Sequence, residues 1–208
     1  MAAGEHFRDR WPVAGYAIVS RDGMIADRNG LYPDSLRDDA DWEMFQSELD
    51  RSAVTVLGRL SHEAAPNTRN RLRVVVTGSS PGLVRAADAY RWNPGAVPAD
   101  RMLEEVLPQG GRVAVPGGRR VFDLFLRRGY AEFHLTRRAT VTLPGGVPVF
   151  SAVTTNADPE AVLARSGMAL AARRPLASGT ELSVWTAERS HPAVRKADQP
   201  GSAPASWP

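Results

Sequence analysis

Short apolar runs separated by turn residues dominate the first two thirds of the chain. Residues 13–20, 53–57 and 72–77 are each long enough for a buried strand, and residues 113–115 form a fourth apolar run. Apolar side chains then recur at the spacing of one helix face after Gly118. This alternation of strands and helices predicts an α/β protein with a mostly parallel central sheet and flanking helices.

Helical spacing is clearest over residues 35–51. Acidic residues crowd the expected first turn, where the helix dipole favours them, and Ser35 or Asp38 can cap this turn. Trp42 and Phe45 lie on one face and are expected to point into the core. Shorter helices are expected around Ser61 and over residues 99–107 and 158–165.

The last part of the chain changes to strand patterns. Residues 130–137 alternate apolar and polar side chains, and residues 168–174 and 181–187 are typical of an antiparallel pair. We therefore expect antiparallel C-terminal strands at one edge of the sheet.

The length of 208 residues allows one domain, expected over residues 13–187, with a flexible arm over residues 1–12 and a disordered tail over residues 188–208. The apolar content of 43% is ordinary for a soluble globular protein, and no apolar run approaches the length of a membrane span. The lack of cysteine excludes disulfides and thiolate chemistry and fits a cytoplasmic location. The net charge of +3 is too weak to indicate a nucleic-acid partner.

Two strand-to-helix junctions combine glycine with arginine. Gly117 and Gly118 precede Arg119 and Arg120, and another glycine precedes Arg59. Glycine lets backbone N–H groups at a helix start approach an anion closely, because it has no Cβ. An ordinary turn is the alternative interpretation, since the G-x-G-x-x-G pattern of dinucleotide-binding loops is absent. We interpret both junctions as candidate phosphate contacts.

One acidic residue interrupts the expected apolar face of the first long helix. Asp41 precedes Phe45 by one helical turn. Because burying an unpaired carboxylate is costly, Asp41 either lies in water at the rim of this face or is held for a ligand. Asp39 is the alternative acid if the helix is shifted. The histidines are scattered without a His-x-x-x-His pair, so no metal site is predicted.

Several motifs occur in an order that resembles the dihydrofolate reductase superfamily. This superfamily includes dihydrofolate reductase, the reductase domain of riboflavin biosynthesis and dihydromethanopterin reductase. The resemblance covers roughly residues 13–150 and implies a dihydrofolate reductase-like fold. The motifs are an Asp-Gly loop after the first strand, an acid four residues before Phe45, Gly58-Arg59-Leu-Ser61, Val-Val-Val-Thr77-Gly-Ser-Ser, Gly117-Gly118-Arg-Arg-Val-Phe122 and Phe-His-Leu-Thr136.

The resemblance implies that NADPH binds along the ends of the strands. Arg59 would lie near the adenosine 2′-phosphate and Ser61 near the pyrophosphate, and a cis peptide would join Gly117 to Gly118. The implied cofactor-binding residues are Ala17, Ile25, Gly58, Arg59, Ser61, Thr77, Ser79, Ser80, Val115, Gly117, Gly118, Arg119, Arg120, Val121 and Phe122.

The resemblance also implies a pterin site. Asp41 would anchor the substrate beside Phe45, and Thr136 would orient it. A pterin presents a ring N–H and an amino group side by side, and one carboxylate can accept both hydrogen bonds. Arg71 falls near the position at which folate enzymes hold a carboxylate of the substrate tail, and the loop over residues 21–32 would close the site.

These implications predict a cytoplasmic, NADPH-dependent oxidoreductase of one-carbon metabolism, with a homodimer as one option and no nucleic-acid or membrane partner. Hydride would pass to the C=N bond of a dihydropterin, either dihydromethanopterin or dihydrofolate. A reductase of a ribosylamino-pyrimidine phosphate in the riboflavin pathway is the first alternative, and a non-catalytic nucleotide-binding protein is the second. The sequence departs from the family pattern at two points: Arg119 replaces a third glycine, and the segment Leu31-Tyr32-Pro33 lacks the usual tryptophan. The altered loop weakens dihydrofolate as the sole substrate.

Overall fold

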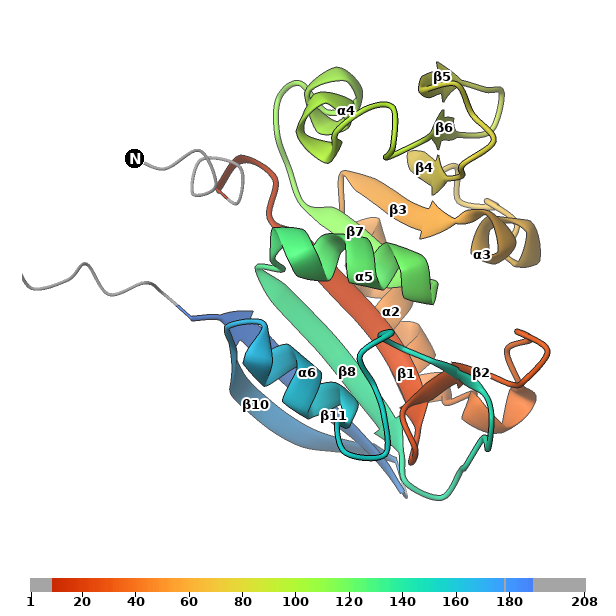
Figure 1. Cartoon of the computed structure of the whole chain (residues 1–208), viewed down its shortest axis with the longest axis vertical. Coiled ribbons are helices and arrows are strands. Elements are labelled where there is room, and N and C mark those ends of the chain that lie inside the picture. Colours follow the sequence, from red (N-terminus) through yellow and green to blue (C-terminus); the bar gives the residue numbers. More distant parts are fainter. Residues whose placement is uncertain (1–8, 178, 189–208) are drawn as a thin grey trace, which may run out of the picture.

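The computed structural model describes residues 9–177 and 179–188, and its centre is a nine-stranded sheet (Figure 1). The strand order is β10-β11-β8-β1-β7-β3-β4-β6-β5. The neighbours from β8 to β6 pair in parallel, whereas β10, β11 and β5 form the antiparallel pairs at the two ends. The strands are β1 (Val13–Ser20), β3 (Val54–Gly58), β4 (Arg73–Val76), β5 (Leu83–Arg85), β6 (Tyr90–Trp92), β7 (Val113–Gly117), β8 (Glu132–Arg138), β10 (Met168–Ala177) and β11 (Thr180–Ala187).

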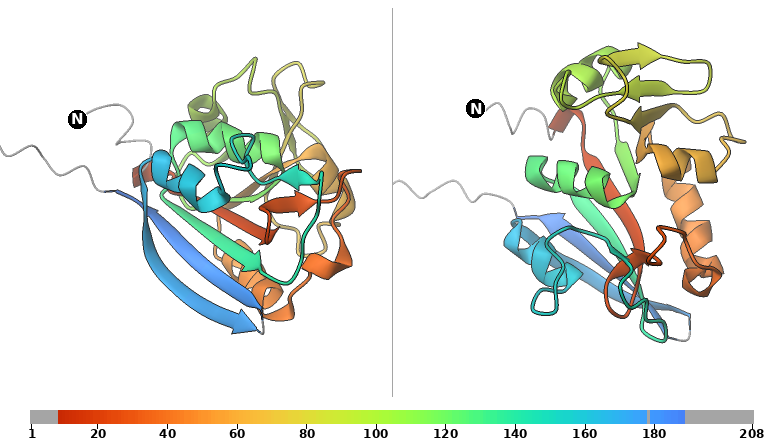
Figure 2. Two further views of the ribbon diagram at one scale, coloured as in Figure 1. Left: turned by 60° about the horizontal axis from the view of Figure 1, so that its bottom comes forward. Right: turned by 45° about the vertical axis from the view of Figure 1, so that its right-hand side comes forward.

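Helices cover both faces of this sheet, which confirms the predicted α/β fold class. Figure 1 shows α5 and α6 in front of the sheet and α2 behind it, and the turned views of Figure 2 show the same arrangement. A separate two-stranded sheet joins β2 to β9. The remaining elements are β2 (Met24–Ala26), η1 (Asp34–Leu36), α2 (Asp39–Asp50), α3 (Arg59–Ala64), α4 (Ala99–Val106), α5 (Arg119–Arg128), β9 (Val147–Pro148) and α6 (Pro159–Arg165).

The alternating side chains of β1 contribute to two hydrophobic layers. The larger layer contains Val13 of β1 and Phe122 of α5. The smaller layer contains Tyr16 of β1, against which Leu49 and Phe45 of α2 pack. Each large side chain that is fully buried in this way stabilises the fold by about 1.5–3 kcal/mol. The sheet therefore holds α2 and α5 at fixed positions on opposite faces.

The first long helix starts later than the sequence predicts. The chain forms η1 and then extends before α2 begins at Asp39, because the side chain of Asp38 caps the helix and accepts a hydrogen bond from the Asp41 N–H (3.0 Å). The prediction that Trp42 faces the core is wrong, since Trp42 is 51% exposed. Phe45, on the next turn, is half-buried and packs against the smaller core layer.

The ordered domain begins before the predicted boundary at residue 13. Trp11 is only 3% exposed within the larger core layer, and its Nε1 donates a hydrogen bond to the Leu107 carbonyl (3.0 Å). The boundary predicted for the flexible arm over residues 1–12 therefore lies too late in the chain, because Trp11 already belongs to the core. Residues 1–8 lie outside the described residues, as does the predicted tail over residues 188–208 apart from its first residue. No helix in the described part of the chain is long and apolar enough to cross a membrane.

Candidate active site

Two clefts lie on either side of α3, where the parallel strands end. The first, which we call the inner cleft, has a volume of about 630 Å³ and is bounded by α2, α3, the loop after β2 and the start of α5. The second, the outer cleft, has a volume of about 700 Å³ and lies between α3 and the segments that follow β4 and β5. The carboxyl ends of strands in an open α/β sheet are the usual place for a ligand.

Asp41 and Thr136 meet in the inner cleft. The Thr136 hydroxyl on β8 donates a hydrogen bond to a carboxylate oxygen of Asp41 on α2 (2.5 Å). Burial raises the pKa of the Asp41 carboxyl above its usual value, although the Thr136 hydrogen bond and nearby His134 oppose this rise. The other candidate acid, Asp39, is exposed and pairs with Arg37 (3.6 Å). Asp41 is therefore the acid that faces the cleft.

The position of Asp41 follows from the way α2 starts. Asp38 is buried, its Oδ1 accepts the hydrogen bond from the Asp41 N–H, and its other oxygen accepts one from the Arg138 guanidinium (3.3 Å). These contacts join the first turn of α2 to the end of β8, the strand that carries Thr136. The same cap that begins the helix thus places the Asp41 carboxylate against Thr136.

The rest of the inner cleft is largely apolar. Phe45 and Phe122 lie in its walls, together with Ala17 and Ile25. Several large apolar side chains that line its opening are exposed: Leu31, Tyr32, Trp42 and Leu60. Exposed apolar patches of this kind mark ligand-binding grooves more often than ordinary surface.

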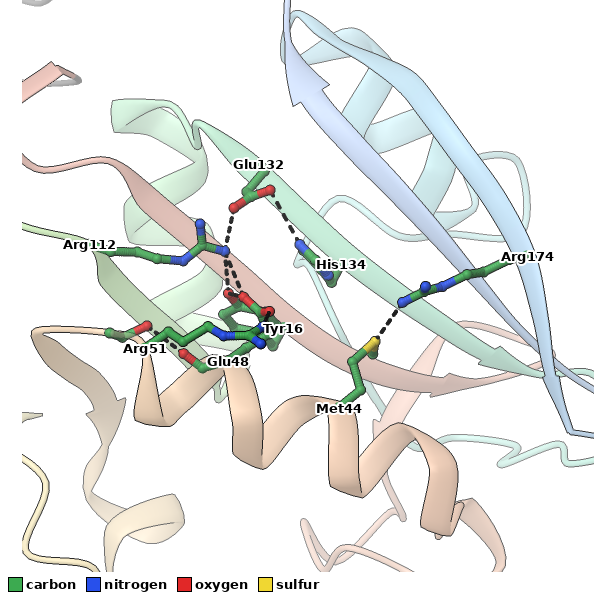
Figure 3. A network of polar contacts seen from close by, with 9 residues as sticks. Tyr16, Met44, Glu48, Arg51, Arg112, Glu132, His134 and Arg174 are labelled. Atoms are coloured by element: carbon green, nitrogen blue, oxygen red, sulfur yellow. Dashed lines mark hydrogen bonds and ion pairs between the residues drawn. The ribbon is translucent and has the colours of Figure 1, made fainter.

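A polar network that sequence reasoning missed forms part of the cleft wall (Figure 3). Tyr16 and His134 line the cleft, with ring centroids 4.9 Å apart. The Tyr16 hydroxyl donates to Glu48 (3.1 Å) and accepts from Arg112 (2.7 Å), and Arg112 also pairs with Glu132. His134 Nε2 lies 3.4 Å from a Glu132 oxygen. The alternation of β8 placed His134 on the face of Thr136, but no local signal in the sequence connects Tyr16, Glu48 and Arg112.

The start of α5 forms the opposite side of the inner cleft. Gly117 has φ +142°, a conformation that favours glycine, and Gly118 caps the helix. Ser61, Gly117, Gly118 and Arg119 all line the cleft. The predicted cis peptide between the two glycines is not found, because no cis bond occurs in the described chain.

The donors at this helix start fit an anionic group. Among the described residues, Arg119 is one of those whose buried side-chain nitrogen, here Nε, has no hydrogen-bond partner. Backbone N–H groups at the first two positions of α5 also lack partners within the helix, whereas the Val121 N–H is already bonded to the Gly118 carbonyl (2.9 Å). Both observations fit the pyrophosphate of a dinucleotide, for which helix N-termini are suited.

The outer cleft contains the other predicted cofactor residues. Thr77 and Ser79 hydrogen-bond to each other (2.8 Å), and Ser80 lies beside them. Arg59 also lines this cleft, where its Nη1 donates to both carboxylate oxygens of Glu63 (2.8 and 2.9 Å). Of the residues that the structure describes, Glu63 is the one that lines both clefts.

The structure does not bring every predicted site residue into a cleft. Val115 and Val121 are buried in the larger core layer, and Arg120 is exposed outside both linings. Gly58 ends β3 and caps α3 without lining either cleft. Arg71 lies outside the clefts too, because its guanidinium is held by Asp50 (2.7 Å) and by the Gln46 side chain and carbonyl. Within residues 9–177 and 179–188, no group of three acidic or histidine side chains could hold a metal ion.

Comparisons with known proteins agree with this geometry at the level of the fold. No family model matches the sequence. No curated protein matches it either. Among solved structures, a protein described as a riboflavin biosynthesis protein from Shewanella sp. PV-4 superposes with a TM-score of 0.63 at 16% identity, covering 86% of this chain and 99% of that one.

Two further solved structures are similar. A diaminohydroxyphosphoribosylaminopyrimidine deaminase/5-amino-6-(5-phosphoribosylamino)uracil reductase from Thermotoga maritima has a TM-score of 0.61 and 17% identity, covering 86% of this chain and 57% of that one. Dihydrofolate reductase from Enterococcus faecalis, complexed with NADP(H) and RAB-propyl, has a TM-score of 0.61 and 15% identity, covering 86% and 97%. The chain therefore has the fold of the dihydrofolate reductase superfamily, as the order of its motifs predicted.

Proposed function

We propose that the protein is an NADPH-dependent reductase of a dihydropterin. The observation that carries this proposal is the Asp41–Thr136 pair in a cleft whose lining is largely apolar. A half-buried carboxylate with one hydrogen-bond donor has acceptor capacity left for a ligand. The adjacent ring N–H and amino group of a pterin match this capacity and would relieve the cost of burying the charge.

The cofactor would lie across both clefts. Arg119 and the N–H groups at the start of α5 would hold its pyrophosphate, and Thr77 and Ser79 would hydrogen-bond to its adenosine half. The bound dinucleotide would supply the hydride to the carbon of a C=N bond, and the nitrogen of that bond would take up a proton from water. The conformation of Gly117, which other residues rarely adopt, keeps the backbone free of side-chain bulk at this point.

The protein's own residues would orient the substrate and exclude water. Asp41 would fix the pterin ring by two charge-assisted hydrogen bonds, while Thr136 holds the carboxylate in place. Phe45 and Phe122 would enclose the rings, so that the two reacting carbons are held in contact. The loop after β2, which contributes Leu31 and Tyr32 to the opening, would cover the bound substrate.

The lining of the cleft opening helps to choose between the candidate substrates. Leu31, Trp42 and Leu60 suit an apolar or aromatic extension of the substrate. A ribosylamino-pyrimidine phosphate would need a cation at this point. Arg119 is the one arginine among the described residues that line the inner cleft, and the pyrophosphate would occupy it. The riboflavin-pathway reaction is the second candidate, favoured by the fold similarity to proteins with those descriptions.

Parallel assays of cofactor oxidation test the proposal. Purified protein would receive NADPH with dihydrofolate, dihydromethanopterin or the ribosylamino-pyrimidine phosphate, and the ratios of kcat/KM would identify the substrate class. We expect turnover of a dihydropterin. Turnover of the pyrimidine alone would replace the proposal by its alternative. NADPH binding without any turnover would favour a non-catalytic nucleotide-binding protein.

A further inference from the structure

The arginines that line the outer cleft already have carboxylate partners from the same cleft. Arg59 donates to both oxygens of Glu63, and Arg91 donates to Asp88 (3.1 Å). His62 Nε2 also lies 2.7 Å from a carboxylate oxygen of Asp88. The cleft is therefore less basic than its arginine content indicates, and an entering phosphate has to compete with a carboxylate for each guanidinium.

Glu63 is the carboxylate with which a phosphate would compete for the Arg59 guanidinium. It lies one helical turn after Arg59 on α3, and it lines the inner cleft as well as the outer one. A dinucleotide that spans both clefts would pass its carboxylate. Asp88, in contrast, lines the outer cleft alone and is held by His62 and Arg91. Glu63 is thus the acid that decides whether Arg59 is available.

NADPH and NADH differ in the group that would lie beside the Arg59–Glu63 ion pair. The 2′-phosphate of NADPH needs a free cation and is repelled by a carboxylate, whereas the ribose 2′-hydroxyl of NADH can donate a hydrogen bond to a carboxylate. Arg59 and Glu63 are both about half exposed (56% and 53%), so their ion pair contributes little to folding. Removing the pair should consequently change ligand choice without unfolding the protein.

We propose that Glu63 sets the choice between NADPH and NADH by occupying Arg59. This inference rests on the proposed function, because it requires a nicotinamide dinucleotide to lie across the two clefts. The protein as it stands then binds the two cofactors with Kd values within about tenfold of each other. Glu63 is a specificity-determining residue that narrows the preference for NADPH over NADH.

Calorimetric titration of each dinucleotide into the full-length protein tests this inference without any pterin. In Glu63→Gln we expect the Kd of NADPH to fall about fivefold and that of NADH to stay constant or rise. Glu104→Gln is the matched control, because Glu104 pairs with Arg101 (2.8 Å) on α4, away from both clefts, and should leave both Kd values unchanged. In an Arg59→Ala background, Glu63→Gln should improve NADPH binding much less, because only the direct repulsion between the carboxylate and the 2′-phosphate is then removed.

The outcomes separate the inference from the proposed function. One outcome would overturn the inference alone: both dinucleotides bind clearly, but the ratio of the NADPH Kd to the NADH Kd in Glu63→Gln stays within about twofold of the ratio in the unaltered protein. The same gain for NADPH in the Arg59→Ala background would overturn the assigned route through Arg59. If neither dinucleotide binds to any variant, the proposed function itself fails.

Discussion

Asp41 is a residue whose environment favours ligand binding over stability. Burial raises the pKa of its carboxyl in the folded protein, so the folded state binds a proton more tightly than the unfolded chain does. The free energy of unfolding therefore decreases as the pH rises from the unfolded pKa through the higher folded pKa. At neutral pH the charged form of Asp41 lowers the stability, a cost that functional sites commonly carry.

Replacing Asp41 by asparagine should make this cost visible. The side-chain amide introduced by Asp41→Asn would still accept the Thr136 hydrogen bond but carries no charge. We therefore expect Asp41→Asn to raise Tm at pH 7 and to lose this advantage as the pH falls below the folded pKa of Asp41. Thermal unfolding over a pH series measures the difference. Lower stability of Asp41→Asn at pH 7 would contradict the assigned environment.

The sequence could predict features that local patterns determine, but not contacts between distant segments that only the fold brings together. The apolar runs and their periodicity predicted seven strands of the main sheet and the order of the helices, because burial on a sheet face imposes those patterns. The short strands β5 and β6 at one end of the sheet showed no clear pattern in the sequence, because three residues are too few for one. The resemblance then predicted Asp41, Thr136 and the residues around Gly117. Tyr16, Glu48 and Arg112 were missed because they come from three separate parts of the chain that only the fold brings together.

At the scale of the element, the cap of α2 should control substrate binding. Removing Asp38 deprives the Asp41 N–H of its acceptor and leaves Arg138 with the Arg37 carbonyl but without its carboxylate partner. We expect Asp38→Ala to cost about 1–2 kcal/mol of stability and to raise the KM for the dihydropterin several-fold, because the first turn of α2 carries Asp41.

Asp158 offers a matched control for this prediction. Its side chain caps α6 in the same way, accepting from the Ala161 N–H (2.8 Å), and it lies outside both clefts. Asp158→Ala should cost similar stability, measured by urea unfolding, without changing that KM. Equal effects of both substitutions on KM would show that the cap of α2 has no special part in placing Asp41.

At the scale of the whole molecule, two tryptophans lie in environments opposite to those predicted. The sequence pattern places Trp11 in a flexible arm, but it is buried in the core; the same reasoning places Trp42 in the core, but it lies exposed at the cleft. Helical spacing alone does not distinguish a core face from a face that lines a cleft, since both are apolar. The homodimer and the cytoplasmic location stay predictions, because the structure of one chain tests neither of them.

Alanine substitutions of these two tryptophans should therefore have opposite consequences. We expect Trp11→Ala to lower the free energy of unfolding by about 3–5 kcal/mol, because it opens a cavity and removes the hydrogen bond to Leu107. Trp42→Ala should change it by less than about 1 kcal/mol but weaken substrate binding. Urea unfolding and steady-state kinetics measure both effects, and a large stability loss in Trp42→Ala would disprove its assignment to the cleft.

We propose that Asp41 holds a dihydropterin for reduction by NADPH, and steady-state kinetics of Asp41→Asn test this role most directly. We predict that kcat/KM for the dihydropterin falls at least about 100-fold in Asp41→Asn while the Kd of NADPH is unchanged, because a charge-assisted bidentate contact is lost. Asp39→Asn, which alters the exposed neighbouring acid, should retain full activity. Normal turnover by Asp41→Asn, or an equal loss in Asp39→Asn, would contradict the account.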